Sequence, residues 1–338
     1  MVNIKDVAKH AGVSAATVSR VINNSANVDE AKRKEVIRSI ETLSYRPNEV
    51  ARSLSNKKSY NLGLLLPNIT NPFFNQIAEE AENTASKYGY KIILCNTHDD
   101  PDREREYIGN LIFSQCDGFI VISDSDILDE FVQHYDVPAV ALDRYKTYDQ
   151  IKTLKYPIVT TDNYAGGRLA AEHLLKCGCT HLAHIGRPEG SRLAELRARG
   201  FADVLKENGL DFFNVTCPFS YSRGLDAAER LFKAYPGVDG IFAGNDMIAF
   251  AVISVAFNKG IRIPEQVQLI GFDNVLFSKL VTPALTTVSQ SIGLLGIRAT
   301  ELLIKKINGE EVPNRVITFP SELIERSTTR ETISKTSI

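Results

Sequence analysis

Long hydrophobic runs are absent from this 338-residue sequence. Apolar stretches such as residues 62–66 and 119–122 are far shorter than the ~20 residues that a membrane-spanning helix requires. No apolar segment with a small-residue cleavage site follows the first residue; Lys5, Asp6 and Lys9 stand there instead, so we expect no export signal. We therefore predict a cytoplasmic protein that does not enter a membrane.

Cysteine is scarce and odd in number, which argues against a disulfide framework in a long chain without an export signal. We expect all the thiols to be reduced. The five residues are Cys95, Cys116, Cys177, Cys179 and Cys217.

One short motif, C-x-C-x-H-x-x-H, contains the thiol and imidazole types that bind zinc. It consists of Cys177, Cys179, His181 and His184. Its spacing matches no common zinc site, and His184 falls in a predicted strand, where neighbouring side chains point to opposite faces. We therefore predict core thiols and no metal.

Catalytic and cofactor motifs are also missing. There is no Walker loop, and the Gly166 and Gly167 pair lacks the spacing of a dinucleotide-binding loop. We expect neither enzymatic activity nor a cofactor, although a fold alone never excludes an enzyme.

The composition is that of a globular protein, with 43% hydrophobic and 24% charged residues. At about 150 residues per domain, the length predicts two or more folded units. The net charge of −2 hides an asymmetry: residues 1–60 hold 11 Lys and Arg against six Asp and Glu, a net +5, and the remainder carries −7. Basic side chains gain affinity for a polyanion by releasing phosphate counterions, so we expect nucleic acid to bind the first segment.

Two helices separated by Gly12 are predicted near the start of the chain. Asn3 can cap the first helix and Ser14 the second. Two helices joined by a tight glycine turn make a helix-turn-helix, whose second helix enters the DNA major groove. Apolar residues recur at helical spacing in both helices: Ile4, Val7, Ala8 and Ala11, then Val18, Val21 and Ile22.

A third helix is predicted from Asp29, and it should close a small core with the first two. The residues expected to be buried are Val36, Ile37, Ile40 and Leu43. The basic charge and the turn together favour DNA binding over an ordinary helical hairpin.

Four segments resemble the head and hinge of the LacI/GalR family of repressors. They are residues 4–14 (IKDVAKHAGVS), 17–23 (TVSRVIN), 45–48 (YRPN) and 50–54 (VARSL). Arginine can grip guanine through two acceptors, and an alanine methyl can meet a thymine methyl. The family usually has Thr at the position of Asn3, and both residues can cap. The resemblance implies base-edge contacts from Ala15, Ala16 and Arg20, phosphate contacts near Ser14 and Thr17, and further DNA contacts from Asn23, Asn48, Ala51 and Leu54.

Residues 1–46 are thus a predicted DNA-binding domain, and residues 47–59 a predicted hinge and linker. Residues 48–54 are too few for a stable isolated helix. In the family they form a hinge helix that pairs with its dimer mate on DNA. Leu54 there occupies the position of an apolar wedge that unstacks a base step in the minor groove. The alternative is a linker leucine packed on the body.

From residue 60 onward, short apolar strands alternate with amphipathic helices, the pattern of parallel sheets covered on both faces. One predicted series comprises residues 62–66, 91–95, 118–122 and 139–142; the second comprises residues 158–161, 182–185, 240–243 and 268–272. Two series predict two doubly wound α/β lobes with a cleft at the carboxyl ends of the strands.

The body, residues 60–338, resembles periplasmic sugar-binding proteins over its whole length. The resemblance implies an N-lobe of about residues 60–161 and 291–322 and a C-lobe of about residues 162–290 and 323–338. It places chain crossings near Thr161, Gln290 and Leu323.

Polar and aromatic residues cluster where the predicted strands end, which is where ligands enter wound sheets. Carboxylates and guanidinium groups bind vicinal hydroxyls, and aromatic faces cover a sugar ring. Taken singly, most of these residues have ordinary structural alternatives. Arg192 and Arg199 are alternatives to Arg197, and Ser191 could also line the cleft. As a set they resemble the pocket of ribose-binding proteins and ribose-type repressors. The resemblance implies ligand contacts from Asn71, Phe73, Phe74, Asp143, Arg144, Arg197, Phe219, Asn245, Asp273 and Gln290.

We therefore predict a transcriptional repressor of a sugar-utilisation operon. Its partners would be a palindromic operator and a small sugar, ribose or a related pentose, coupled to DNA binding through lobe closure. We expect a homodimer rather than a tetramer, because no leucine heptad precedes the last residue.

Two other regulators are possible. A catabolite-control type would bind a phosphorylated carrier protein, but Glu301 stands where such relatives have an arginine, and an acid repels phosphate. A purine-responsive repressor fits less well, because Asp143 and Arg144 suit hydroxyls better than a planar base.

Overall fold

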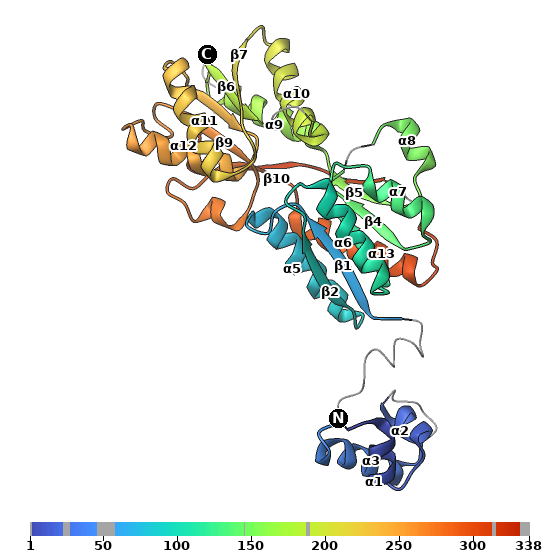
Figure 1. Ribbon diagram of the computed structural model, residues 1–338. Coiled ribbons are helices and arrows are strands. Elements are labelled where there is room, and N and C mark those ends of the chain that lie inside the picture. The colour runs from blue at the N-terminus through green and yellow to red at the C-terminus, as the bar shows by residue number, and fades with distance from the viewer. Residues whose placement is uncertain are drawn as a thin grey trace. The chain divides into compact units, whose positions relative to one another are not determined.

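The computed structural model describes residues 2–22, 28–45, 58–144, 146–186, 190–312 and 316–331. The chain divides into two compact units, Met1–Tyr60 and Asn61–Ile338 (Figure 1). In the described residues, no helix combines the length and apolar character needed to cross a membrane.

The described residues of the first unit form three helices around a small core: α1 (Ile4–His10), α2 (Ala15–Ile22) and α3 (Glu30–Thr42). Asn3 caps α1 in a reciprocal capping box with Asp6. Val7, Val18 and Val36 are completely buried, one from each helix, so the predicted three-helix core is present.

The prediction that Ile37 is buried was wrong. Its side chain is 44% exposed, and Ser39 is buried in its place, with its hydroxyl 2.9 Å from Nδ1 of His10. Residues 36, 39, 40 and 43 share one face of a helix with 3.6 residues per turn, whereas residue 37 lies about 100° away from residue 36.

The second unit contains two six-stranded sheets, each in its own lobe (Figure 1). In the first lobe every neighbouring pair is parallel, in the order β11-β5-β4-β3-β1-β2. The strands are β1 (Asn61–Leu66), β2 (Lys91–Asn96), β3 (Gly118–Val121), β4 (Ala139–Leu142), β5 (Ile158–Thr161) and β11 (Val316–Phe319). The accompanying helices are α5 (Pro72–Lys87), α6 (Pro101–Phe113), α7 (Ile127–His134), α8 (Tyr148–Thr153) and α13 (Ile292–Ile307).

The second lobe has the order β12-β10-β9-β8-β6-β7, and only β12 runs antiparallel to its neighbour. Its strands are β6 (Leu182–Gly186), β7 (Phe212–Thr216), β8 (Gly240–Ala243), β9 (Gln268–Asp273), β10 (Thr286–Ser289) and β12 (Glu322–Ile324). Its helices are α9 (Asn163–Lys176), α10 (Arg192–Glu207), α11 (Tyr221–Ala234) and α12 (Asp246–Asn258), with a short 3₁₀ helix at Leu276–Lys279. The predicted fold class, a helical head followed along the chain by two doubly wound α/β lobes, is confirmed. The predicted hinge helix lies outside the described residues.

The strand pattern grouped residues 158–161 with the second series, but β5 pairs with β4 and β11 in the first lobe. The N-lobe range that the resemblance implied, about residues 60–161, includes this strand. The central strands β3 and β4 are buried along their whole length, as expected when helices cover both faces. The sequence interpretation missed β7, a partly exposed edge strand.

Candidate functional site: a helix-turn-helix and an interlobe cleft

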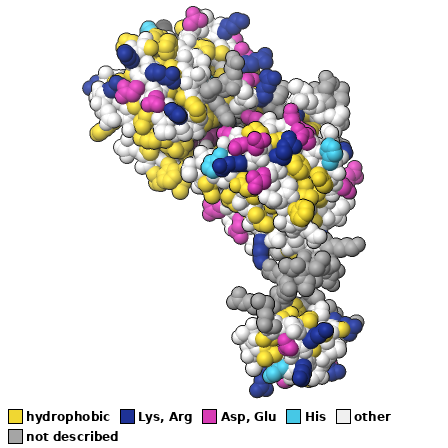
Figure 2. All heavy atoms as spheres, viewed as in Figure 1, with side chains coloured by type: hydrophobic (Ala, Val, Ile, Leu, Met, Phe, Trp, Pro, Cys, Tyr) yellow, Lys and Arg dark blue, Asp and Glu magenta, His cyan; other side chains and the backbone are white. Residues whose placement is uncertain are grey.

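The predicted DNA-reading helix, α2, keeps its apolar residues inward and its polar residues outward. Val18 and Val21 are buried, whereas Ala16 and Arg20 are exposed. The hydroxyl of Ser14 accepts a hydrogen bond from the Thr17 backbone N–H at 3.1 Å, the geometry of an N-cap. Figure 2 shows Lys and Arg side chains on the visible surface of this unit. The arrangement can present α2 to a DNA groove.

The residues predicted to contact DNA differ in exposure. Ala15 is half-buried and packs against the small core, so its methyl group is less accessible to a base than that of Ala16. Asn23, Asn48, Ala51 and Leu54 lie outside the described residues, and their roles stay predictions.

A cleft at the carboxyl ends of the strands is lined by both lobes. Eight of the ten predicted ligand residues line it, and so does Ser191: the eight are Asn71, Phe73, Phe74, Asp143, Arg197, Phe219, Asn245 and Asp273. Asp99, Ser123 and Asp124 also line it, and the sequence interpretation missed them. They follow β2 and β3, so the strand-end rule that found Asp143 would have found them as well.

The first lobe contributes aromatic rings and a constrained carboxylate. Asn71 caps α5 by accepting from the Phe73 backbone N–H at 3.1 Å, and the rings of Phe73 and Phe74 meet edge to face with centroids 5.1 Å apart. Asp143 follows β4 with a φ of +52°, a left-handed conformation that costs backbone energy in a non-glycine residue. Its Oδ1 is buried without a hydrogen-bond partner. Burial raises the pKa of Asp143 to about 6, and the charge of Arg197 opposes that rise.

Arg197, from α10, is the central cation of the cleft. It is 5% exposed, and its Nε donates to Oδ1 of Asn163 at 2.6 Å while Nη1 donates to the Gly244 carbonyl at 2.9 Å. The guanidinium carbon lies 4.0 Å from the ring centroid of Phe272, within cation–π range. These contacts hold the guanidinium with nitrogens left to bind a ligand.

Arg192 and Arg199, the neighbouring arginines, lie on the exposed side of α10 and do not line the cleft. Arg192 and Arg199 are exposed side chains that pair with Glu195 and Asp203 at 3.2 and 3.7 Å. The inward face of α10 instead carries Arg197 together with other buried residues.

Gly167, which belongs to no dinucleotide-binding loop, has a packing role together with Gly200. A Cβ at Gly167 would lie 2.0 Å from the Arg197 carbonyl oxygen, and one at Gly200 would lie 2.1 Å from the Tyr164 carbonyl oxygen. These two glycines therefore allow α9 and α10 to approach closely, and this close packing positions Arg197.

The second lobe supplies Asp273 at the end of β9, with a φ of +122°. Burial raises the pKa of this carboxyl well above its usual range, and the charge of Arg197 opposes that rise. Gln290 does not line the cleft, but its Nε2 donates to Oδ1 of Asp273 at 2.6 Å. Asn245 caps α12 by accepting from the Ile248 backbone N–H at 3.0 Å.

Arg144, from which a ligand contact was predicted, does not line the cleft. Its buried guanidinium donates to the Ser125 carbonyl and, at 3.0 Å each, to Asp126 and Asp129. The two neighbouring side chains point in different directions. Asp143 lines the cleft, whereas the guanidinium of Arg144 points toward the segment that follows β3.

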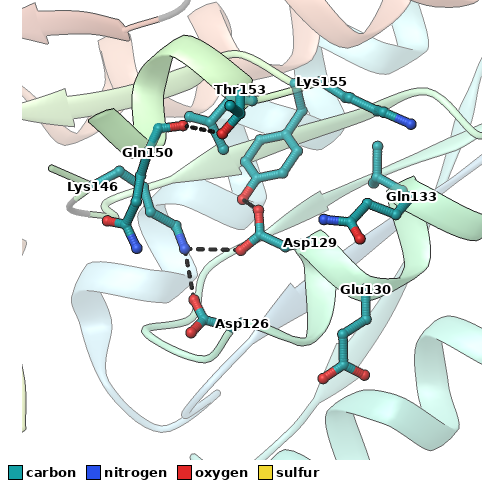
Figure 3. A pocket seen from close by; sticks show the side chains of 11 residues that line it. Asp126, Asp129, Glu130, Gln133, Lys146, Gln150, Thr153 and Lys155 are labelled. Atoms are coloured by element: carbon teal, nitrogen blue, oxygen red, sulfur yellow. Dashed lines mark hydrogen bonds and ion pairs between the residues drawn. The ribbon is translucent and has the colours of Figure 1, made fainter. Parts of the chain in front are cut away.

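Beside Arg144, a second hollow of about 250 Å³ opens between α7 and α8 (Figure 3). On its wall, Lys146 donates to Asp126 at 2.6 Å and to Asp129 at 2.8 Å, and the Tyr156 hydroxyl donates to Asp129 at 2.6 Å. Opposite charges are paired within this wall.

The side chains of the cysteine–histidine motif point into different environments. Cys177 Sγ donates to the Arg330 carbonyl, and Cys179 Sγ donates to the Asp239 carbonyl. His184 packs against the rings of Phe201 and Phe242, which also stack on each other. Within the described part of the chain, no group of three or more His, Cys, Asp or Glu converges as a metal site would.

Comparisons with known proteins match both units. The family model described as bacterial regulatory proteins, lacI family, matches residues 3–48. The model described as periplasmic binding proteins and sugar binding domain of LacI family matches residues 59–327.

Individual relatives match over nearly the whole chain. A ribose operon repressor of Halalkalibacterium halodurans is 40% identical over 330 residues, covering 98% of each chain. The crystal structure of the Lac repressor dimer bound to operator and the anti-inducer ONPF has a TM-score of 0.87 at 26% identity, covering 97% of this chain and 98% of that one. A LacI family regulator from Enterococcus faecium with bound ribose has a TM-score of 0.72 at 28% identity, covering 80% of this chain and 98% of that one.

Proposed function

The chain belongs to the LacI family of bacterial regulatory proteins, and from this premise we propose that it represses a sugar-utilisation operon. A homodimer binds a palindromic operator through the two helix-turn-helix units, and a small sugar in the cleft controls that binding. Acting on DNA places the protein in the cytoplasm, as a regulator rather than an enzyme.

The observation that carries this proposal is the pairing of Arg197 with Asp273 in the cleft, their charged atoms 3.8 Å apart. Asp143 from the other lobe and the ring of Phe219 line the same space. Carboxylates accept hydrogen bonds from hydroxyls, the guanidinium donates to them, and the ring covers an apolar face of a sugar. Such a set suits a neutral polyol.

The effector we propose is ribose or a related pentose. The Halalkalibacterium halodurans relative is named for the ribose operon, and the Enterococcus faecium regulator was crystallised with ribose. A ligand held by both lobes favours whichever interlobe geometry gives it the most contacts. It alters operator affinity to the extent that it binds the two geometries differently.

The two alternative regulators have less support. Glu301 lies on α13, and its carboxylate pairs with Arg298 at 3.3 Å, so this helix presents an acid where a phosphorylated partner would need a cation. Three charged residues of the cleft, Asp143, Arg197 and Asp273, suit hydroxyls better than a purine ring.

The test uses the full-length dimer. A duplex selected from a random palindromic pool is titrated by fluorescence anisotropy, with and without millimolar D-ribose, and a pentose and hexose panel is titrated by calorimetry. We expect sequence-specific binding and at least a tenfold change in operator affinity with a pentose. Binding to random and selected duplexes with equal affinity, or no response to any sugar, contradicts the proposal.

A further inference from the structure

A buried polar network lies behind the first-lobe wall of the cleft. It is centred on Glu104, in the first turn of α6, which is 2% exposed. Glu104 Oε2 accepts hydrogen bonds from the hydroxyls of Ser123 at 2.6 Å and Ser125 at 2.9 Å. Ser123 and its neighbour Asp124 line the cleft, so this carboxylate holds the loop that presents them.

Arg144 ties the same loop to the next one. Its guanidinium donates to the Ser125 carbonyl and to Asp126 and Asp129, all in the segment that follows β3. Arg144 itself follows Asp143, whose carboxylate lines the cleft from the segment after β4. Hydrogen bonds and the chain itself therefore link Glu104 through the segment after β3 to Arg144 and its neighbour Asp143.

Stability alone does not account for this arrangement. Burying charged groups costs free energy even when they are paired, and apolar packing is often the more stable alternative. Here one oxygen of Glu104 and one nitrogen of Arg144 are buried without a hydrogen-bond partner. The left-handed backbone of Asp143 also persists only because surrounding contacts hold it. The first cost falls on Glu104 and Arg144, behind the cleft wall, and the second falls on Asp143, which lines the cleft.

We propose that Glu104 and Arg144 are positioning residues for the effector. Neither lines the cleft; they hold Ser123, Asp124 and Asp143 in the geometry that binds the sugar. A binding group contributes much less to ligand affinity when it is displaced by more than about 0.5 Å from its productive position. This inference rests on the proposed function and assigns a role to two residues that lie outside its ligand set.

The experiment compares Glu104→Ala with Glu104→Gln in the full-length protein. The amide oxygen of glutamine can still accept from both serines, so Glu104→Gln should bind D-ribose within about threefold of the wild type. Glu104→Ala removes the acceptor to which both serine hydroxyls donate, and its ribose Kd, measured by calorimetry, should rise at least tenfold. Operator affinity without sugar should stay within twofold for both variants.

Leu111→Ala is the matched control, because Leu111 is buried on the same helix and packs near Gly63 rather than on the loop. It should lower the melting temperature and leave the ribose Kd within twofold. If Glu104→Ala does not fold, Ser125→Ala replaces it, since Ser125 donates to Glu104 and does not line the cleft.

A double-mutant cycle tests Arg144. If Glu104 and Arg144 act through the same loop, the effects of Glu104→Ala and Arg144→Met on the ribose Kd should be less than multiplicative. Multiplicative effects would overturn the shared role of Arg144, and an unchanged ribose Kd in folded Glu104→Ala would overturn the inference. A wild-type protein that binds no pentose would instead overturn the proposed function.

Discussion

The guanidinium of Arg197 and the carboxylate of Asp273 face each other in the cleft with Nη1 and Oδ1 3.8 Å apart. Both side chains are almost completely buried, and Asp273 is further held by the amide of Gln290. A pair at this distance is not a closed salt bridge with ideal hydrogen bonds. It leaves donor and acceptor capacity unused in the cleft that both residues line.

Replacing the arginine should therefore abolish most sugar affinity. Arg197→Met leaves Asp273 buried without its cation, and truncating one partner of such a pair costs about 2–5 kcal/mol. Calorimetry with D-ribose should show a loss of at least 30-fold. The control is Arg199→Met, which removes an exposed arginine two positions away and should leave the affinity unchanged. A loss of similar size in both variants would show that Arg197 has no special place in the cleft.

Asp143 should make stability depend on pH in a defined direction. Burial raises its pKa to about 6, above the ~3.9 of an unfolded aspartate, so the folded protein binds this proton more tightly. Its contribution to the free energy of unfolding therefore increases as the pH falls from above 6 toward 4.

The measurement compares wild type with Asp143→Asn at each pH by thermal unfolding. The stability of wild type relative to the variant should be greater at pH 4.5 than at pH 7.5. His184, whose pKa burial lowers to about 4, opposes this trend, since its neutral form is favoured in the fold. It is present in both proteins and cancels in the comparison. A difference that stays constant across this range would contradict the assignment.

Two helical glycines should respond to alanine with opposite signs. Gly167→Ala places a Cβ 2.0 Å from the Arg197 carbonyl oxygen, so α9 and α10 must separate. We expect a melting temperature lower by several degrees and weaker ribose binding. Gly109→Ala, in α6, meets nothing within 4 Å and should raise stability by about 0.5–1 kcal/mol through the helix propensity of alanine. Equal melting temperatures for the two variants would refute this packing argument.

Arg20 should read a base, because it is exposed on α2. Arg20→Ala should cost about 1–3 kcal/mol of operator affinity and relax the preference at one base pair of each half-site. Competition between the selected duplex and single-base variants measures both effects. Arg38→Ala, on the exposed side of α3, is the matched charge control and should retain the sequence preference. If Arg20→Ala weakened all duplexes equally, the contact would be to phosphate.

Much of the fold could be predicted because its signals are local. The capping pattern at Asn3, the glycine turn and the helical spacing of Val18 and Val21 depend on neighbouring residues alone. The strand-end rule also located Asp143 and Asp273 before any geometry was known, because a parallel sheet gathers the ends of its strands at one edge. The same rule, applied to every strand, would have included Asp99 and Asp124.

Other features depend on contacts between distant segments. The sheet to which β5 belongs is decided by pairing with β11, more than 150 residues later, and no local pattern encodes a partner so far away. The direction of Arg144 depends on the carboxylates of Asp126 and Asp129 and on the Ser125 carbonyl. The exposure of Ile37 depends on how α3 is rotated against the core.

Residue types and periodicity by themselves determined the helical head, the wound lobes and most of the chemistry available at the cleft. Only the tertiary structure decided which arginine of α10 lines the cleft and which charged groups are buried behind the cleft wall. The physical reason is that periodicity specifies the face on which a side chain lies, whereas its partner is chosen by packing between elements that meet only in the folded chain.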